Sequence, residues 1–109
     1  MKVSGKVVGG KRKGRELGFP TANIELKDKV ESGVYAGMVN FEGKKYKAGI
    51  FVSPDGKLIE AHLIGFSGDL YGEEVGIEIN DKVRDAMKFK NDDELRNQIK
   101  RDIEAISNT

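Results

Sequence analysis

Short segments of alternating apolar and polar residues, separated by turn-forming residues, constrain the fold of this chain more than any other feature. In residues 75–80 the alternation is strict: Val75, Ile77 and Ile79 share one side, and Glu78 lies on the other. This period of two predicts a strand with one face packed inward. The same pattern predicts six strands: Val3–Val8, Thr21–Leu26, Val34–Phe41, Lys45–Val52, Leu58–Ile64 and Val75–Ile79.

Turn signals between these segments favour an antiparallel arrangement. Glu42-Gly43 is typical of a hairpin turn, and Ser53-Pro54-Asp55-Gly56 has proline and glycine in their favoured turn positions. Glycine supplies 14 of the 109 residues, nearly twice its usual share. The fold class predicted is all-β with a C-terminal helix, a six-stranded antiparallel Greek-key-like closed β-barrel.

Helical periodicity is confined to the end of the chain. Asn91 is a good N-cap, and Glu94 three residues later completes a capping box. An apolar stripe follows, made of Leu95, Ile99, Ile103 and Ile106. We expect this amphipathic helix to cover an open end or a flank of the barrel.

Composition limits the classes of function. With 19 Lys and Arg against 18 Asp and Glu, the formal net charge is +1, which gives no reason to expect a dedicated nucleic-acid or membrane surface. The absence of cysteine excludes disulfides and thiolate metal sites, and a single histidine leaves too few ligands for catalytic zinc. We expect one domain, residues 1–109, in the cytoplasm.

The basic residues gather near the N-terminus, where glycines interrupt them. Residues 1–16 carry six Lys and Arg against one Glu, and within them lies Gly9-Gly10-Lys11-Arg12-Lys13-Gly14-Arg15. Glycines let backbone N–H groups approach phosphate oxygens, and the side chains add a positive field. Taken alone, such a stretch is more often a solvated loop than a phosphate site. Arg15-Glu16 also stands where a Walker A loop has Lys and then Ser or Thr, so a P-loop NTPase is not expected.

Downstream of the basic stretch, two neutral oxygens fall two residues apart. If the chain is extended after Pro20, the side chains of Thr21 and Asn23 leave the same face. A hydroxyl and an amide carbonyl suit Mg²⁺, which takes its remaining ligands from waters and substrate phosphates. The alternative is an ordinary turn and strand start in which both side chains bond the backbone.

Glu60 is out of place in an apolar strand unless it is solvated, paired or used in chemistry, because Ile59 and Ala61 flank it. His62 shares its face two residues on. That histidine could orient Glu60, contact substrate, or be a barrel histidine satisfied by a neighbour, and we do not assign it a catalytic role.

The ordered set of these motifs resembles the riboflavin kinase family of bacteria and eukaryotes. The signature Gly-x-x-x-Gly-Arg-x-Leu-Gly-Phe-Pro-Thr-Ala-Asn is matched by residues 10–23. Later matches follow in order: Gly33–Ala36, Ile59–Leu63, Phe66, Asp69–Gly72, Arg84, Phe89, Asp93–Leu95, Gln98, Ile99 and Asp102. The resemblance covers nearly the whole chain.

This resemblance implies an ATP-dependent phosphotransferase that moves the γ-phosphoryl group of ATP to the ribityl 5′-hydroxyl of riboflavin, giving FMN and ADP. Glu60 would be the catalytic base, and Thr21 and Asn23 would bind Mg²⁺. The nucleotide-binding residues implied are Gly10, Lys11, Gly14, Arg15, Gly18, Pro20, Thr21 and Asn23. The flavin-binding residues implied are Arg84, Phe89 and Tyr71.

The expected partners are riboflavin or FMN and ATP or ADP, with no nucleic acid, no membrane and a monomeric state. Many bacterial relatives carry an adenylyltransferase domain, for which 109 residues leave no room, so FAD synthesis is not expected. Two alternatives stay open. One is a non-catalytic flavin- or nucleotide-binding barrel, and the other is a small barrel that holds RNA with its basic end.

Overall fold

The computed structural model describes residues 1–9 and 18–108, which form one antiparallel sheet and a helix. The strands and helix are β1 (Lys2–Lys6), β2 (Ala22–Glu25), β3 (Gly33–Phe41), β4 (Lys44–Val52), β5 (Leu58–Leu63), β6 (Glu74–Arg84) and α2 (Asp92–Ser107). Their order across the sheet is β1-β6-β3-β4-β5-β2. The last strand along the chain therefore returns to lie between the first and the third.

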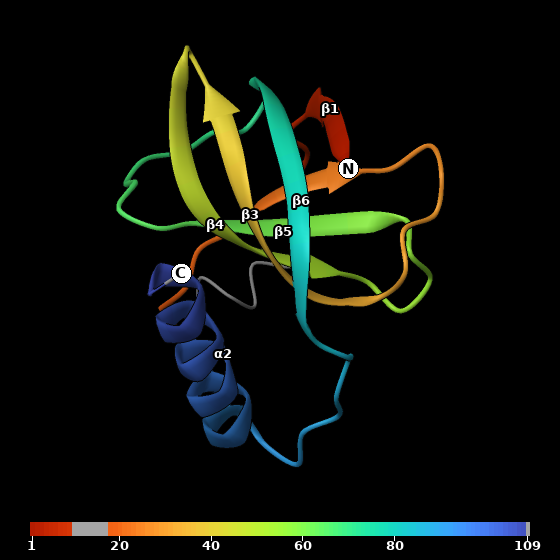
Figure 1. Ribbon diagram of the computed structural model, residues 1–109, viewed down its shortest axis with the longest axis vertical. Helices are drawn as coiled ribbons and strands as arrows, with labels where there is room; N and C mark the ends of the chain where they lie inside the picture. The colour runs from red at the N-terminus through yellow and green to blue at the C-terminus, as the bar shows by residue number, and fades with distance from the viewer. Residues whose placement is uncertain (10–17, 109) are drawn as a thin grey trace.

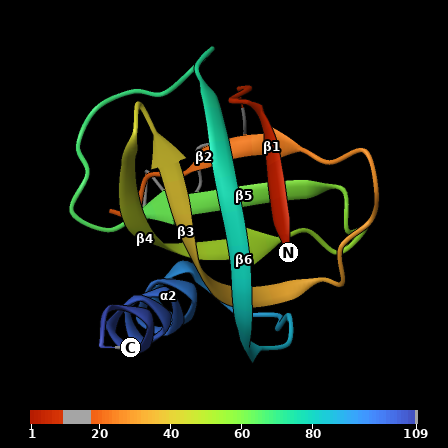
Figure 2. The same ribbon diagram turned by 45° about the horizontal axis from the view of Figure 1, so that its top comes forward.

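The sheet curls until its two edge strands meet. β1 and β2 are in contact, and just beyond β1 the Val8 backbone N–H donates to the Asn23 carbonyl at 2.8 Å. A Cβ at Gly5 of β1 would lie 2.9 Å from Ile24 of β2, so glycine permits the close approach. The six antiparallel strands thus form a nearly closed barrel, as predicted (Figures 1 and 2).

The barrel interior is filled by the apolar members of the alternating segments. Val39, Ala48, Ile50, Ile59 and Ala61 have no exposed surface. Their removal from water supplies the main drive for closure. The polar members, including Glu60, lie on the outer face.

Both predicted turns are present. β3 and β4 are joined by Glu42 and Gly43 alone, with φ of 50° and 78°, as in the two-residue hairpins whose twist matches that of the strands. In the second turn, Gly56 donates its N–H to the Ser53 carbonyl at 2.9 Å. Gly56 has φ 75°, and a Cβ there would lie 2.5 Å from the Val30 carbonyl oxygen, so the turn needs glycine.

β6 is longer than the predicted strand Val75–Ile79. It continues to Arg84 because its polar second half still pairs with β3 after two register shifts, with Lys82 opposite Tyr35 and Arg84 opposite Val34. The Lys82 ammonium lies 6.0 Å from the Tyr35 ring centroid. The register shifts are β-bulges or similar irregularities, and they interrupt the alternation of apolar and polar residues. The sequence pattern therefore ended the predicted strand before its second half.

α2 begins as predicted, with a small difference at the cap. The Asn91 side chain accepts from the Glu94 backbone N–H at 2.9 Å. The Glu94 carboxylate accepts from the N–H of Lys90 at 3.1 Å, one residue before the N-cap that a capping box would use.

The helix packs on the outer face of β4, outside the barrel (Figure 1). A Cβ at Gly49 would lie 2.8 Å from Ile103 Cδ1 and 3.4 Å from Ile106 Cδ1. Glycine at this point of β4 lets the apolar stripe of α2 approach the sheet. Of the two expected positions, an open end or a flank of the barrel, the helix takes the flank.

Candidate functional site

Strand register brings five residues into one row across the outer face of the barrel. Asn23 in β2 lies opposite Glu60 in β5, Glu60 lies opposite Phe51 in β4, and Phe51 lies opposite Val34 in β3. Val34 in turn lies opposite Arg84 in β6. Directly opposite residues of antiparallel strands point to the same face. Figure 2 shows β2, β5 and β4 crossing behind β3 and β6.

Asn23 holds the most unusual polar atom of the row. The residue is 6% exposed, and its Oδ1 is buried with no hydrogen-bond partner among the described residues. A buried carbonyl oxygen without a donor is costly, and such an atom is a signal for a ligand. Thr21, two residues earlier, is half-buried just before β2 begins. The Asn23 oxygen and the Thr21 hydroxyl fit the neutral donor set of a hard cation that arrives with phosphates.

Glu60 is half-buried in the middle of β5. Its sequence neighbours Ile59 and Ala61 have no exposed surface, because they face the core. Glu60 points the other way, between Asn23 and Phe51. The carboxylate that looked misplaced in an apolar strand therefore lies on the same face as the Asn23 amide.

His62 contacts the segment that leads into β2. Its Nδ1 lies 2.8 Å from the Pro20 carbonyl oxygen, and its ring packs edge-on against Phe19 with centroids 5.6 Å apart. Of the readings left open by the sequence, the structure favours a histidine satisfied by a neighbour.

A cavity of about 640 Å³ adjoins this row at the end of the barrel. Its walls come from the approach to β2, from the end of β5 and from the loop before β6. The lining residues are Val8, Gly9, Pro20, Thr21, Ala22, Asn23, Ala61, Leu63, Phe66, Ser67, Gly68, Asp69, Leu70 and Tyr71. The cavity thus brings together four of the residues named from the sequence: Pro20, Thr21, Asn23 and Tyr71.

Tyr71 stands at the mouth of this cavity, 67% exposed. The Asp69 carboxylate accepts from its backbone N–H at 2.9 Å and fixes the turn. A Cβ at Gly9 would lie 3.7 Å from the Tyr71 ring. The Tyr71 ring therefore lies next to Gly9, the last described residue before residues 10–17.

Arg84 and Phe89 lie together at the other end of the row and do not line the cavity. The Arg84 guanidinium donates to the Asp102 carboxylate through Nε at 3.0 Å and Nη2 at 2.8 Å, and its Cζ lies 5.8 Å from the Phe89 ring centroid. Asp102 is 2% exposed and also accepts from Gln98. The three predicted flavin residues are therefore divided between two places.

Four predicted nucleotide-binding residues, Gly10, Lys11, Gly14 and Arg15, lie outside the described residues. Of the others, Gly18 has φ 93°, a left-handed conformation that suits glycine. Across residues 1–9 and 18–108, no group of three His, Cys, Asp or Glu side chains is arranged to hold a metal ion. In the same ranges, no helix has the length and apolar character required to cross a bilayer.

Sequence reasoning missed Phe51 and the role of Asp102. Phe51 neighbours Glu60 only through the β4–β5 register, which residue spacing does not reveal. Asp102 falls one position from the apolar Ile103 in a helix whose stripe predicts burial. A carboxylate bordering that stripe was the available signal.

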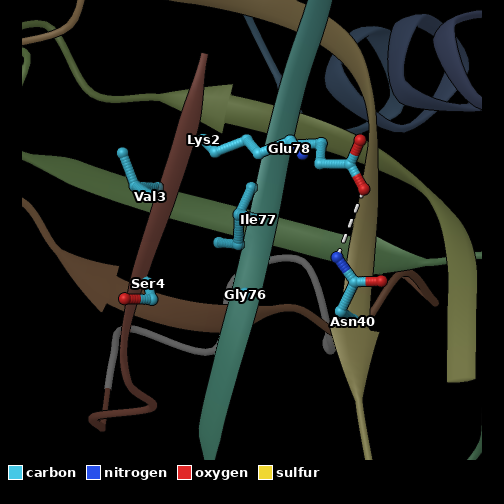
Figure 3. A pocket seen from close by; sticks show the side chains of 7 residues that line it. All are labelled: Lys2, Val3, Ser4, Asn40, Gly76, Ile77 and Glu78. Carbon is cyan, nitrogen blue, oxygen red and sulfur yellow. Dashed lines mark hydrogen bonds between the residues drawn. The ribbon is translucent and has the colours of Figure 1, made fainter. Parts of the chain in front are cut away.

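A second depression, of about 280 Å³, lies on the β1-β6-β3 side of the barrel (Figure 3). Its lining residues are Lys2, Val3, Ser4, Asn40, Gly76, Ile77 and Glu78. Asn40 donates to Glu78 at 3.2 Å, and Lys45 lies 3.3 Å from the same carboxylate. These contacts, Asn40 first, hold the pKa of Glu78 below its ordinary value. Asn40 and Lys45 already satisfy the Glu78 carboxylate, so we do not treat this depression as the functional site.

Comparison with known proteins identifies one family. A family model described as flavokinase, riboflavin kinase, matches residues 1–109. A bifunctional riboflavin kinase/FMN adenylyltransferase of Buchnera aphidicola (subsp. Schizaphis graminum) is 36% identical over 115 residues, covering 95% of this chain and 37% of the relative. Its counterpart of the same name in Escherichia coli K12 is 38% identical over 109 residues, covering 92% and 35%. The chain thus spans little more than a third of the length of these curated relatives.

Two solved structures are similar as well. The riboflavin kinase of Trypanosoma brucei matches with a TM-score of 0.71 and 26% identity over 98% of this chain and 77% of that one. A crystal structure from Streptococcus pneumoniae, described as a macrolide-efflux protein, matches with a TM-score of 0.86 and 36% identity over 99% of this chain and 38% of that one. The barrel with its C-terminal helix is therefore a known arrangement.

Proposed function

The chain belongs to the riboflavin kinase family, and from that premise we propose that it transfers the γ-phosphoryl group of ATP to the ribityl 5′-hydroxyl of riboflavin. The products are FMN and ADP. The observation that carries the proposal is the direct pairing of Asn23 with Glu60 across β2 and β5, because it gives a metal ligand and a base on one face.

Thr21 and Asn23 hold Mg²⁺ together with the phosphates of ATP in this proposal. The buried, partnerless Asn23 Oδ1 supports the assignment, since a cation would satisfy it. Both ligands are neutral, which suits a cation whose charge the nucleotide balances. When bound, the metal neutralises charge on the phosphates during transfer. The nucleotide enters the cavity that these two residues line.

Glu60 accepts the proton of the riboflavin 5′-hydroxyl while the oxygen of that hydroxyl attacks the γ-phosphorus of ATP. The bond between the γ-phosphorus and the oxygen that leaves with ADP breaks in the same step. Cβ atoms of directly opposite residues lie about 5 Å apart, so the base and the Asn23 ligand act within one small space. A base near the attacking hydroxyl contributes typically 10²- to 10⁴-fold to the rate.

The flavin lies along the row that leads from Glu60 to Arg84. From Glu60 to Arg84 the row crosses three strand spacings, or about 14 Å, and it passes Phe51, an apolar side chain beside the base. Arg84 and Phe89 close its far end, with the guanidinium oriented by Asp102. Tyr71 lies beside the nucleotide cavity, so its proposed flavin contact would be made from that side.

The expected one-domain organisation, monomeric state and cytoplasmic location remain predictions, as do the phosphate contacts of the segment 10–17. The absence of nucleic-acid and membrane partners also remains a prediction.

The direct test is incubation of the pure protein with riboflavin, ATP and Mg²⁺, followed by chromatographic separation of the flavins. FMN and ADP should appear in equal amounts, and omission of Mg²⁺ should abolish both. Quenching of riboflavin fluorescence without FMN would instead indicate the non-catalytic flavin-binding barrel. RNA retention that falls with salt, with no flavin effect, would indicate the RNA-holding barrel.

A further inference from the structure

The approach to β2 is held to β5 by a side chain at the point where the strand ladder ends. The β2–β5 register begins at Ala22 opposite Ala61, so Thr21 lies outside it. Pro20 has no N–H with which to extend the ladder. Its carbonyl instead accepts from His62 Nδ1 at 2.8 Å.

The geometry fixes which ring nitrogen carries the proton. A carbonyl oxygen only accepts, so Nδ1 of His62 must be the donor, and Nε2 is the acceptor of the neutral ring. Protonation of Nε2 leaves the Nδ1–H in place. The contact to Pro20 therefore exists in both charge states of the ring.

His62 also lies on the same face as the proposed metal ligands and base. It follows Glu60 by two residues in β5, and continuing the register past Ala22 and Ala61 places it opposite Thr21. Thr21, Asn23, Glu60 and His62 are thus the four corners of one small patch. The carbonyl that His62 holds belongs to the peptide that carries the Thr21 nitrogen.

We propose that His62 is a positioning residue, whose Nδ1–H fixes the Pro20–Thr21 peptide so that the Thr21 hydroxyl and the Asn23 Oδ1 face one cation. The inference rests on the proposed function of the site. Without this hydrogen bond, Asn23 stays in its strand, while Thr21 loses its orientation toward the metal. Binding of metal-nucleotide weakens, while riboflavin binding is spared.

Two variants separate the hydrogen bond from packing against Phe19. His62→Asn removes the ring but can place an amide N–H near the position of Nδ1, and His62→Phe keeps a ring but has no donor. The probe is Mn²⁺ with ADP, followed through the free Mn²⁺ signal in electron paramagnetic resonance. We expect His62→Phe to bind it about tenfold more weakly, and His62→Asn within about threefold of the native protein. The KM for Mg-ATP should follow the same order, with the KM for riboflavin little changed.

Equal binding by the native protein and His62→Phe, or weak binding by His62→Asn alone, would overturn the proposal. So would a native protein that does not bind Mn²⁺ with ADP. Native binding without FMN formation would overturn the proposed kinase activity and leave the positioning role measurable. If His62→Phe fails to fold in a thermal scan, the ring ¹⁵N shifts of the native protein decide. A protonated Nδ1 supports the proposal, and a neutral ring protonated only at Nε2 overturns it.

Discussion

Among single residues, Glu60 should show the sharpest effect of a change in one atom. Glu60→Gln keeps the shape of the side chain beside Asn23 and Phe51 but removes its capacity to accept a proton. We expect turnover to fall roughly a hundredfold or more, with riboflavin affinity nearly unchanged. FMN formation and riboflavin fluorescence titration measure the two quantities. Near-native turnover would remove Glu60 from the role of base.

The matched control for this variant lies on the neighbouring strand. Glu25 is an exposed carboxylate in β2, two residues after Asn23 and opposite Leu58. Glu25→Gln should leave turnover at the native level. A loss equal to that of Glu60→Gln would mean that charge near β2, rather than a placed base, sets the rate.

A change at Asn23 should affect the Mg²⁺ requirement of the reaction much more than the stability of the fold. Its Oδ1 has no partner among the described residues, so this oxygen adds nothing favourable to the folded state. Asn23→Ala should therefore lower the free energy of unfolding by less than about 1 kcal/mol, while the Mg²⁺ concentration for half-maximal turnover rises about tenfold or more. Urea denaturation and a Mg²⁺ titration measure the two. An unchanged metal requirement would argue against the Thr21 and Asn23 ligand pair.

For single residues, the sequence indicates the candidate functional side chains better than it indicates which residues lie beside them in the fold. The spacing of Thr21 and Asn23 and the isolated Glu60 are visible along the chain. That Asn23 faces Glu60, and that Phe51 stands beside it, depends on the pairing of strands distant in sequence, which local patterns do not encode. The roles of these residues remain predictions.

Among elements, the attachment of α2 to β6 depends on one buried ion pair. Asp102 is 2% exposed and receives two N–H groups of Arg84, whose side chain is 17% exposed. Asp102→Ala leaves the guanidinium without its counter-charge, and we expect the free energy of unfolding to fall by about 3 kcal/mol. Urea denaturation measures the change.

A second ion pair on the same helix is the control. Arg96 and Asp93 lie 2.8 Å apart, but Asp93 is 85% exposed, and such surface pairs contribute about 0.5 kcal/mol or less. Asp93→Ala should thus be nearly neutral. Equal losses from Asp93→Ala and Asp102→Ala would show that helix charge, rather than the buried pair, explains the effect.

Element boundaries were predictable where the local chemistry is strong. The hairpin at Glu42 and Gly43 and the N-cap at Asn91 need only their own residues, and both predictions are confirmed. The second half of β6 is polar and pairs with β3 only after two register shifts. Its existence depends on the partner strand, so alternation alone ended the strand too early.

In the whole molecule, the strand order β1-β6-β3-β4-β5-β2 determines which candidate site residues become neighbours. The short β2 lies at one edge, where the 640 Å³ cavity opens beside it. On the outer face, α2 packs against β4 at Gly49. A six-stranded barrel with a terminal helix was predictable from alternation, turns and family resemblance. The row from Asn23 to Arg84 was not, because it depends on four strand registers at once.

The dependence of stability on pH belongs to the whole molecule, because the groups concerned lie on separate parts of it. The pKa values of Asp55, Glu78 and Asp85 are lowered chiefly by side-chain hydrogen bonds from Ser53, Asn40 and Lys82, respectively. A carboxyl with a lowered folded pKa adds stability that is full above its ordinary value, here 3.8 for Asp and 4.5 for Glu. That stability is lost as pH falls through the folded pKa.

The opposite sign applies to Lys82, whose pKa is raised above 10.5, chiefly by its hydrogen bond to Asp85. Its contribution is full below that value and is lost as pH rises through the raised pKa. We therefore expect the free energy of unfolding to be level between about pH 5 and 10 and to fall on both sides. Glu78→Gln should lower the plateau and make the acid decline shallower. Urea denaturation from pH 2.5 to 7 measures both, and native and variant curves that stay parallel would show that Glu78 does not contribute to the acid decline.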